Sequence, residues 1–171
     1  DRRTGDVTHP TADLDRTLGL HGSVQWGPDE ELLYFATPDE GATAFWEVAW
    51  DDTDPDMVLR EDWSSIDGAD VGEDTVAFVR SEWDHPGDLF VATRGGAQER
   101  RLTRVNDDYF EDRAVGRPEE LNYESDQGEV QGWVLRPPEF DEDEQYPMVV
   151  EIHGGPHAMW GNTFWHEFQT I

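Results

Sequence analysis

The feature of this sequence that most constrains its fold is a repeat of short strand-like segments joined by tight turns. A Gly-Pro-Asp turn precedes the apolar run at residues 32–35, and a second turn at 38–41 precedes the run at 44–48. The same pattern returns later, so that Phe78 follows Phe35 by 43 residues and Phe90 follows Trp46 by 44. Repeats of about 40–45 residues are typical of β-propeller blades. A meandering β-sandwich with accidental internal similarity is the alternative.

A shorter internal similarity indicates that the chain begins inside a repeat unit. Residues 6–8 and 15–19 resemble residues 101–103 and 112–116. The chain therefore holds about two blades and a remnant, fewer than the about 4–8 blades of a closed propeller. We expect it to be part of a larger protein. Because open sheet edges expose unpaired strands, we expect the isolated chain to be unstable or to form a homo-oligomer.

The pattern changes at Pro118, where we place a domain boundary. Residues 120–124 and 130–135 flank a Ser-Asp-Gln-Gly turn, which predicts a hairpin. The β-branched run at 146–152 lies between a proline and two glycines, and it predicts a buried strand of a mostly parallel sheet. We therefore expect a mainly β chain, with a partial β-propeller over residues 1–117 and a second domain over 118–171.

A helix is expected after the glycines. Asn162 or Thr163 is suited to cap its first turn. Phe164, Trp165 and Phe168 would then lie on its buried side. The predicted order is strand, glycine loop, helix.

Charge excludes several classes of partner. The chain carries 12 Lys+Arg against 40 Asp+Glu, a formal net charge of −28, and every base is Arg. Such a surface repels phosphate backbones and anionic lipids, so we expect neither nucleic-acid nor membrane binding. Self-repulsion opposes compaction unless it is screened, and the Debye length falls to about 3 Å at about 1 M salt. We therefore expect a protein of a cytoplasm kept at molar salt.

The segment that carries chemistry follows the strand predicted at 146–152. Glycines let the backbone adopt positive φ and approach a ligand closely, so Gly154 and Gly155 suit a loop that presents backbone N–H groups. Pro156 has no N–H and stiffens the turn. A loop of this kind can aim an amide at a developing oxyanion, as in the HGGG-type loops of α/β-hydrolases.

These residues resemble the prolyl oligopeptidase family of serine peptidases, and most of all its acylaminoacyl-peptidase branch. The resemblance rests on Ile-His-Gly-Gly-Pro-His at 152–157, on the motif at 161–169, on Gln-Gly-Trp-Val-Leu-Arg-Pro-Pro at 131–138 and on both repeats. It implies a propeller followed by the start of an α/β-hydrolase domain. It also implies a peptide substrate, short and N-acylated peptides among them, and cleavage through an acyl-enzyme without a cofactor.

Carried over residue by residue, the resemblance makes the Gly155 amide an oxyanion donor, with His153, Gly154 and Pro156 shaping the loop. The family's catalytic Ser, Asp and His lie C-terminal to this loop. We find no Gly-x-Ser-x-Gly in the 171 residues. The chain thus supplies half an oxyanion hole without nucleophile, acid or base, and we expect no turnover from it alone. A non-enzymatic propeller interaction module and a carboxylesterase remain as alternatives.

The other candidate sites favour structural roles. His153 and His157 have a metal-ligand spacing only on a helix, which Gly-Gly-Pro forbids, so we expect no metal there. We expect His85 in a turn, His166 on the predicted helix, and arginines 80, 94, 100 and 101 paired with surface acids. The tryptophans at strand positions are expected to pack in the core; they are Trp26, Trp46, Trp50, Trp63, Trp83 and Trp133.

Overall fold

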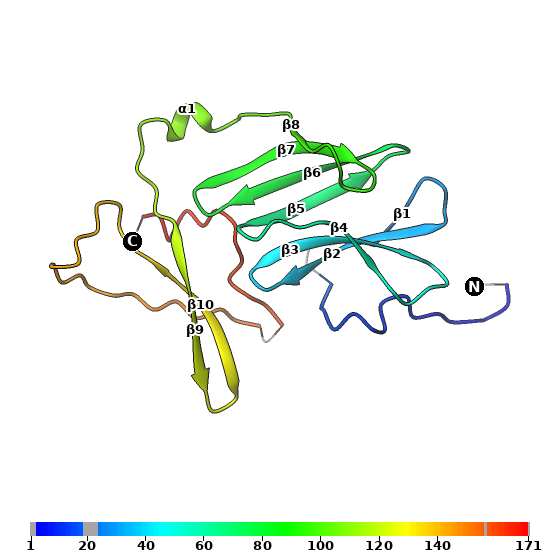
Figure 1. Ribbon diagram of the computed structural model, residues 1–171, viewed down its shortest axis with the longest axis horizontal. Helices are drawn as coiled ribbons and strands as arrows, with labels where there is room; N and C mark the ends of the chain where they lie inside the picture. The colour runs from blue at the N-terminus through cyan, green and yellow to red at the C-terminus, as the bar shows by residue number, and fades with distance from the viewer. Residues whose placement is uncertain (1–2, 19–23, 156, 171) are drawn as a thin grey trace.

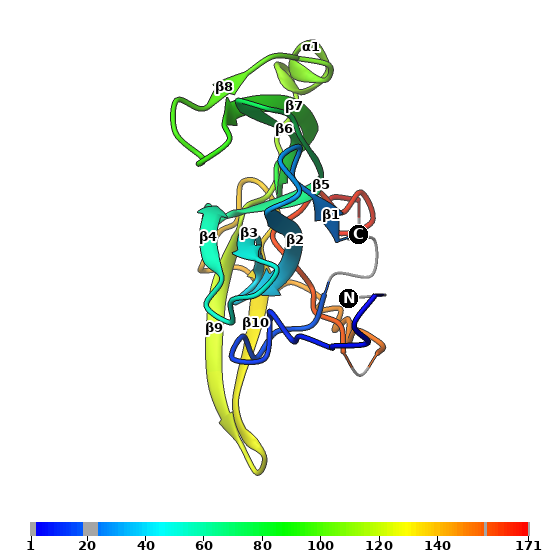
Figure 2. The same ribbon diagram turned by 90° about the vertical axis from the view of Figure 1, so that its right-hand side faces the viewer.

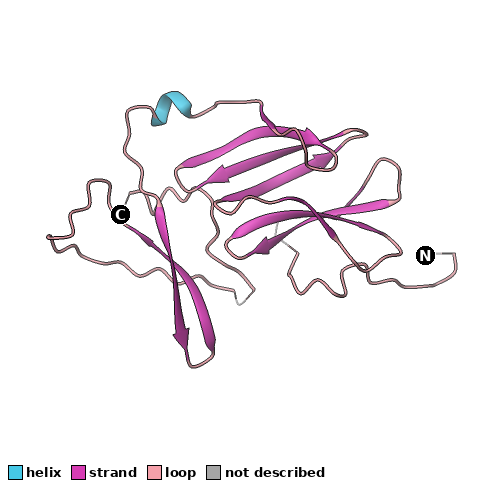
Figure 3. Cartoon of the chain, in the orientation of Figure 1, coloured by secondary structure: helices cyan, strands magenta, loops and turns pink. Residues whose placement is uncertain are grey.

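The computed structural model describes residues 3–18, 24–155 and 157–170 (Figure 1). Two four-stranded antiparallel sheets dominate these residues (Figure 3). The first sheet runs in the order β1 (Gln25–Trp26), β2 (Leu32–Asp39), β3 (Ala42–Ala49), β4 (Asp56–Leu59). The second runs β5 (Ser64–Val71), β6 (Thr75–Glu82), β7 (His85–Thr93), β8 (Arg100–Arg101). Both sheets are meanders of consecutive hairpins, so the mainly β prediction is confirmed.

Turn chemistry sets the register of the first sheet. Glu40 and Gly41 form the two-residue connection between β2 and β3, with φ of 50° and 85°. Two consecutive positive φ values fit a type I′ hairpin, whose twist matches that of the strands it joins. A Cβ on Gly41 would lie 2.6 Å from Cζ2 of Trp133, so this turn also needs a residue without a side chain.

Alternation along the strands builds a core between the sheets. Tyr34 and Phe45 of the first sheet stack with ring centroids 5.9 Å apart, and Phe78 and Phe90 of the second stack at 5.6 Å. These rings belong to one buried cluster. Each fully buried side chain of this size contributes about 1.5–3 kcal/mol relative to exposure. Burial between the sheets therefore fixes the first sheet against the second (Figure 2).

The sequence repeat matches the observed register. Phe35 pairs with Trp46 across β2 and β3, and Phe78 pairs with Phe90 across β6 and β7. The two pairs nevertheless lie in different clusters. Phe78 and Phe90 pack toward the first sheet, whereas Phe35 and Trp46 belong to a second cluster, on the face of the first sheet opposite Tyr34. The sheets therefore stack front to back, with equivalent faces pointing the same way.

The hairpin expected after residue 118 is confirmed. β9 (Pro118–Ser125) and β10 (Gly128–Leu135) pair only with each other among the described strands and project away from both sheets in Figure 1. Along the chain, a four-residue helix, α1 (Asp107–Phe110), follows β8 and precedes this hairpin. No helix within the described ranges is long and apolar enough to cross a membrane.

Three predictions of secondary structure are wrong. Residues 146–152 form no strand: Met148 and Ile152 are both 84% exposed, because no strand of the described chain pairs with this segment. The helix after Asn162 is replaced by turns, such as the hydrogen bond from the Phe168 N–H to the Trp165 carbonyl at 3.1 Å. The turn predicted at residues 85–88 is instead the start of β7.

The shifted turn has a local cause. Glu82 pairs with His85 and Arg80 with Asp88, so one residue of β6 lies opposite two residues of β7. This is a β-bulge, a position that tolerates the missing N–H of a proline. Pro86 and Gly87 occupy it, and the turn itself lies two residues earlier, at 83–84.

Half of the tryptophans expected in the core are exposed. Trp46 and Trp83 are buried and Trp133 is half-buried, as predicted. The exposed ones lie at strand ends or just outside strands, where sheet neighbours cover one side at most; they are Trp26, Trp50 and Trp63.

Candidate functional site

The predicted oxyanion loop is an exposed, irregular segment. His153, Gly154 and Gly155 are adjacent and exposed, and Nδ1 of His153 lies 2.9 Å from the Gly154 carbonyl oxygen. The loop is neither part of a helix nor sealed in packing. Pro156 lies outside the described residues. The three described members of the predicted site are thus brought together in an open loop.

Two reasons were expected for glycine in this loop, a positive φ and a close approach of the backbone. Neither Gly154 nor Gly155 has a positive φ, so the expectation of left-handed backbone is wrong. Close approach is the constraint at residue 155 instead. A Cβ there would lie 2.9 Å from the backbone nitrogen of His157 and 3.2 Å from that of Ala158. A Cβ at Gly154 would meet nothing within 4 Å.

The chain then turns from the exposed loop to the ends of the two sheets. Asn162 is only 3% exposed, and three of its groups are bonded. Its N–H donates to the Gly41 carbonyl (2.6 Å), its Nδ2 to the Asp62 carbonyl (2.5 Å), and its Oδ1 accepts from Nε1 of Trp83 (2.7 Å). The Asn162 side chain is therefore bonded to the sheets and not to the turns that follow it, and the hydroxyl of Thr163, the other predicted cap, bonds the Ser81 hydroxyl at 2.6 Å. Figure 1 shows this red C-terminal trace passing along the ends of both sheets.

A second polar anchor lies seven residues further on. Gln169 accepts from the Gly116 N–H at 2.8 Å and donates Nε2 to the carbonyls of Gly116 and Trp83 at 2.9 and 3.1 Å. Between the two anchors, Phe168 stacks on Trp83 with ring centroids 6.1 Å apart. We call residues 158–169 the docking segment.

Rings of the docking segment also pack on one another. Trp160 contacts Trp165 and Phe168 edge to face, with ring centroids 4.7 and 4.9 Å apart. The predicted inner side of the segment, Phe164, Trp165 and Phe168, is half-buried, whereas His166 is exposed. The predicted pattern of burial is therefore right although the helix is absent.

A cleft of about 490 Å³ opens beside Asn162. Four carboxylates from the first sheet's loops and from the hairpin line it, with Arg60 as the cation among its lining residues. These carboxylates are Glu40, Asp62, Glu120 and Glu129. The excess of negative charge disfavours an anionic ligand at this position.

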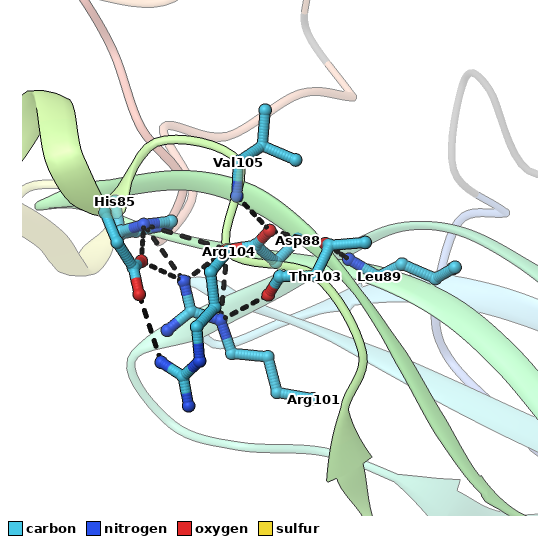
Figure 4. Close-up of polar contacts among 8 residues, drawn as sticks. His85, Asp88, Leu89, Arg101, Thr103, Arg104 and Val105 are labelled. Carbon is cyan, nitrogen blue, oxygen red and sulfur yellow. Dashed lines mark hydrogen bonds and ion pairs between the residues drawn. The ribbon is translucent and has the colours of Figure 1, made fainter.

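A separate charged cluster lies on the second sheet, at the start of β7 (Figure 4). One ligand atom from each of His85, Asp88 and Asp107 falls within 4.8 Å of the others. This is the one such group found among the described residues. Arg101 already supplies the cation: its guanidinium bonds both carboxylates and lies 3.3 Å from Nε2 of His85. The cluster therefore binds an arginine where a metal ion would sit.

Asp88 is the centre of that cluster and is 3% exposed. It accepts hydrogen bonds from the Thr103 hydroxyl, from the Val105 N–H at 3.1 Å and from Nε of Arg101 at 3.1 Å. Burial by itself raises the pKa of Asp88, but these bonds outweigh it and hold the pKa below its ordinary value. His85, expected in a turn, instead begins β7 within this network.

The arginines expected to pair with acids do so at three of four positions. Arg80 bonds Glu61 and Glu99, each at 2.7 Å, and Arg94 bonds Asp29 at 2.8 Å. Arg101 is the cation of the cluster above.

Sequence reasoning missed the two polar anchors. Asn162 was predicted as a helix cap, and no role was predicted for Trp83 beyond packing. The only signal in the sequence was the motif at 161–169, which carries the resemblance but does not say what it contacts.

Comparison with known proteins finds no matching family model. Among curated proteins, the chain is 30% identical over 149 residues to the uncharacterized peptidase YuxL of Bacillus subtilis, covering 85% of this chain and 22% of that protein. It is 26% identical over 158 residues to dipeptidyl-peptidase 5 of Porphyromonas gingivalis, covering 91% of this chain and 22% of that protein.

Among solved structures, the acylaminoacyl peptidase of Pyrococcus horikoshii matches with a TM-score of 0.80 and 27% identity. The match covers 96% of this chain and 25% of that one. An acylaminoacyl peptidase in complex with Z-Gly-Gly-Phe-chloromethyl ketone matches with a TM-score of 0.81 and the same identity. The chain thus spans about a quarter or less of the length of these proteins, and the resemblance to acylaminoacyl peptidases is confirmed.

Proposed function

We propose that this chain is a segment of a serine peptidase of the prolyl oligopeptidase family, in which the last propeller blades meet the start of an α/β-hydrolase domain. The observation that carries the proposal is the match of 96% of the chain, at a TM-score of 0.80 and 27% identity, to an acylaminoacyl peptidase. The two curated relatives described above are likewise named as peptidases.

The stacking of the two sheets supports the propeller part of the proposal. In a β-sandwich made of two repeats, equivalent faces would meet in one core. Here the equivalent pairs Phe35–Trp46 and Phe78–Phe90 point the same way, as in consecutive propeller blades. Leu14, from the segment before the first sheet, packs on the face that carries Phe35. This contact supports the proposal that the segment is a remnant of a preceding blade.

The second part of the proposal concerns residues 118–171. The hairpin of β9 and β10 begins the catalytic domain, and the loop at 153–155 supplies an oxyanion donor. A serine from the remainder of the longer protein attacks the peptide carbonyl, and the carbonyl oxygen becomes an anion in the tetrahedral intermediate. The Gly155 N–H donates to that oxygen. The catalytic histidine of the longer protein takes the serine proton and gives it to the amine that leaves when the intermediate collapses, and water then hydrolyses the acyl-enzyme.

The proposal is tested on the longer protein that contains this chain. A serine-directed fluorophosphonate should label this longer protein. The protein should also hydrolyse short peptide p-nitroanilides, and its rates on N-acylated and on free dipeptidyl p-nitroanilides should be compared. Absence of both labelling and hydrolysis, in a folded preparation at high salt, would refute the peptidase function and favour the interaction module.

A glycine substitution then tests the loop. In Gly155→Ala the new Cβ would lie 2.9 Å from the His157 nitrogen, so the loop must shift. A displacement of this kind costs on the order of 10²-fold in kcat. The matched control is Gly95→Ala, whose Cβ meets nothing within 4 Å and whose φ is ordinary. Equal activity of the two variants would contradict the role assigned to Gly155.

We also propose that the protein works in a cytoplasm at molar salt. Its 40 acidic residues face 12 bases, none of which is Lys. At least eight of the arginines form ion pairs with carboxylates in the described residues, and twelve bases leave most of the 40 acids without a protein counter-charge. Concentrated salt would supply the missing screening.

A further inference from the structure

The oxyanion loop has few contacts of its own. His153, Gly154 and Gly155 are exposed, and a hydrogen bond within the loop joins the His153 ring to the Gly154 carbonyl. An oxyanion donor is effective only when it is held in place before the reaction. Something outside the loop must therefore fix its position.

The docking segment is the nearest part of the chain that is firmly held. Asn162 lies seven residues after Gly155 and bonds three separate parts of the sheets. Gly41 belongs to the β2–β3 turn, Asp62 to the connection between the sheets, and Trp83 to the β6–β7 turn. Through its backbone N–H and its side chain, this one residue ties the segment that follows the loop to both sheets at once.

Trp83 is the partner that both anchors of this segment share. Its Nε1 donates to Asn162 and its carbonyl accepts from Gln169. Its ring, 4% exposed, lies between Trp133 and Phe168, with ring centroids at 6.2 and 6.1 Å. A buried hydrogen-bonding group that loses its partner costs about 1–3 kcal/mol of stability, because water cannot replace that partner. The Asn162 anchor is therefore held strongly in one arrangement.

We propose that Trp83 is a positioning residue of the peptidase, which through Asn162 holds the Gly155 amide at the reacting carbonyl. The inference rests on the proposed function and deepens it: the sheets take part in catalysis by fixing one oxyanion donor. Trp83 itself touches no substrate in this role.

The test is Trp83→Phe in the longer protein. Phenylalanine keeps a ring between Trp133 and Phe168 but removes the Nε1 donor to Asn162. We expect kcat to fall about tenfold while KM changes less than about twofold, because the donor acts on the transition state. A peptide aldehyde, whose serine adduct places its oxygen at the oxyanion position, should lose affinity by the same factor. The corresponding peptide amide should bind as before.

The chain offers a matched control. Trp46 donates its Nε1 to the Thr37 hydroxyl at 2.9 Å in the first sheet, also in a buried position and away from the docking segment. Trp46→Phe therefore removes the same kind of bond and should lower the melting temperature to a similar degree. Its kcat and its ratio of aldehyde to amide affinity should equal those of the wild type.

A second variant keeps the test decisive if Trp83→Phe does not fold. In Asn162→Asp the side chain keeps its size, but a carboxylate oxygen replaces Nδ2. The hydrogen bond to the Asp62 carbonyl is then lost, because two oxygen acceptors face each other. It should show the same selective loss of kcat and aldehyde affinity. The inference is overturned if a folded variant retains wild-type kcat and aldehyde affinity, or if Trp46→Phe loses them equally. A wild-type protein that neither reacts with fluorophosphonate nor hydrolyses peptides instead refutes the proposed function, and this inference falls with it.

Discussion

Replacing Asp88 by Asn should destabilise the second sheet locally and strongly. One carboxylate oxygen of Asp88 accepts from Thr103 and from the Val105 N–H, and the other accepts from Arg101. An asparagine can keep the first set with its oxygen. Its NH₂ group then faces the guanidinium of Arg101, so two hydrogen-bond donors oppose each other. Asp88 is only 3% exposed, so water cannot easily separate them.

The magnitude follows from the burial of this pair. Breaking a buried ion pair by removing one partner costs about 3–5 kcal/mol. Arg101 is 26% exposed and keeps its bond to Asp107, which places the expected cost at the lower end, about 3 kcal/mol. A pair with both side chains well exposed, such as Arg136 and Glu119, is worth about 0–1 kcal/mol.

Hydrogen exchange read by mass spectrometry measures this cost where it arises. In peptides covering residues 85–105, amides that exchange by local opening should exchange about 150-fold faster in Asp88→Asn, since about 1.4 kcal/mol is a factor of ten. Peptides of the first sheet should change far less. Glu119→Gln, the control, should change exchange in its own hairpin by less than about fivefold.

The dependence of the melting temperature on pH in acid gives an independent test of the role of Asp88. The pKa of Asp88 is held below its ordinary value, so its stabilisation is complete above the pKa of the unfolded carboxyl and is lost as pH falls through the lower folded value. Asparagine does not titrate. The melting temperature should therefore fall less steeply with acid in Asp88→Asn than in the wild type. Exchange at residues 85–105 as slow as in the wild type would refute this account of Asp88.

Two further predictions concern the whole surface and one loop. Raising KCl from about 0.1 M to about 3 M should raise the melting temperature, because a net charge of −28 is then screened within about 3 Å; a melting temperature that does not change would refute the high-salt proposal. Gly96→Ala should destabilise by about 2–4 kcal/mol, because Gly96 has a φ of +79° and a Cβ would lie 2.0 Å from the Val58 carbonyl oxygen. Gly95→Ala, with open space around it, is its control in urea denaturation, and equal midpoints would contradict the reasoning.

Local signals in the sequence were sufficient for the β2–β3 hairpin and for the approximate positions of β6 and β7. Turn residues such as Gly41 mark where the chain reverses, and alternation around Phe35 and Phe78 marks which side is buried. These are properties of a few neighbouring residues, so they can be read before the fold is known. The turn at 83–84 was misplaced because Pro86 and Gly87 occupy a bulge, which uses the same residue types as a turn.

The candidate site was only partly predictable, because its supports are distant in sequence. The strand expected at 146–152 depends on pairing with other strands, and none of the described strands provides it. Asn162 was a sound helix cap by local rules, but its side chain is committed to Trp83, 79 residues earlier. Similarly, the meeting of His85, Asp88 and Asp107 around Arg101 depends on how the strand β8 and the residues after it return to β7.

Three of the four edge strands of the two sheets are short, which limits how copies of this chain can meet; the fourth, β5, has eight residues. β1 and β8 are two residues long and β4 is four, and β8 consists of two arginines. At these edges a strand from another copy could form only a few backbone hydrogen bonds. At β8 it would also meet two charged arginines. Strand-by-strand growth into a fibre is therefore disfavoured at β1, β4 and β8 even while the strands inside each sheet are long and well paired.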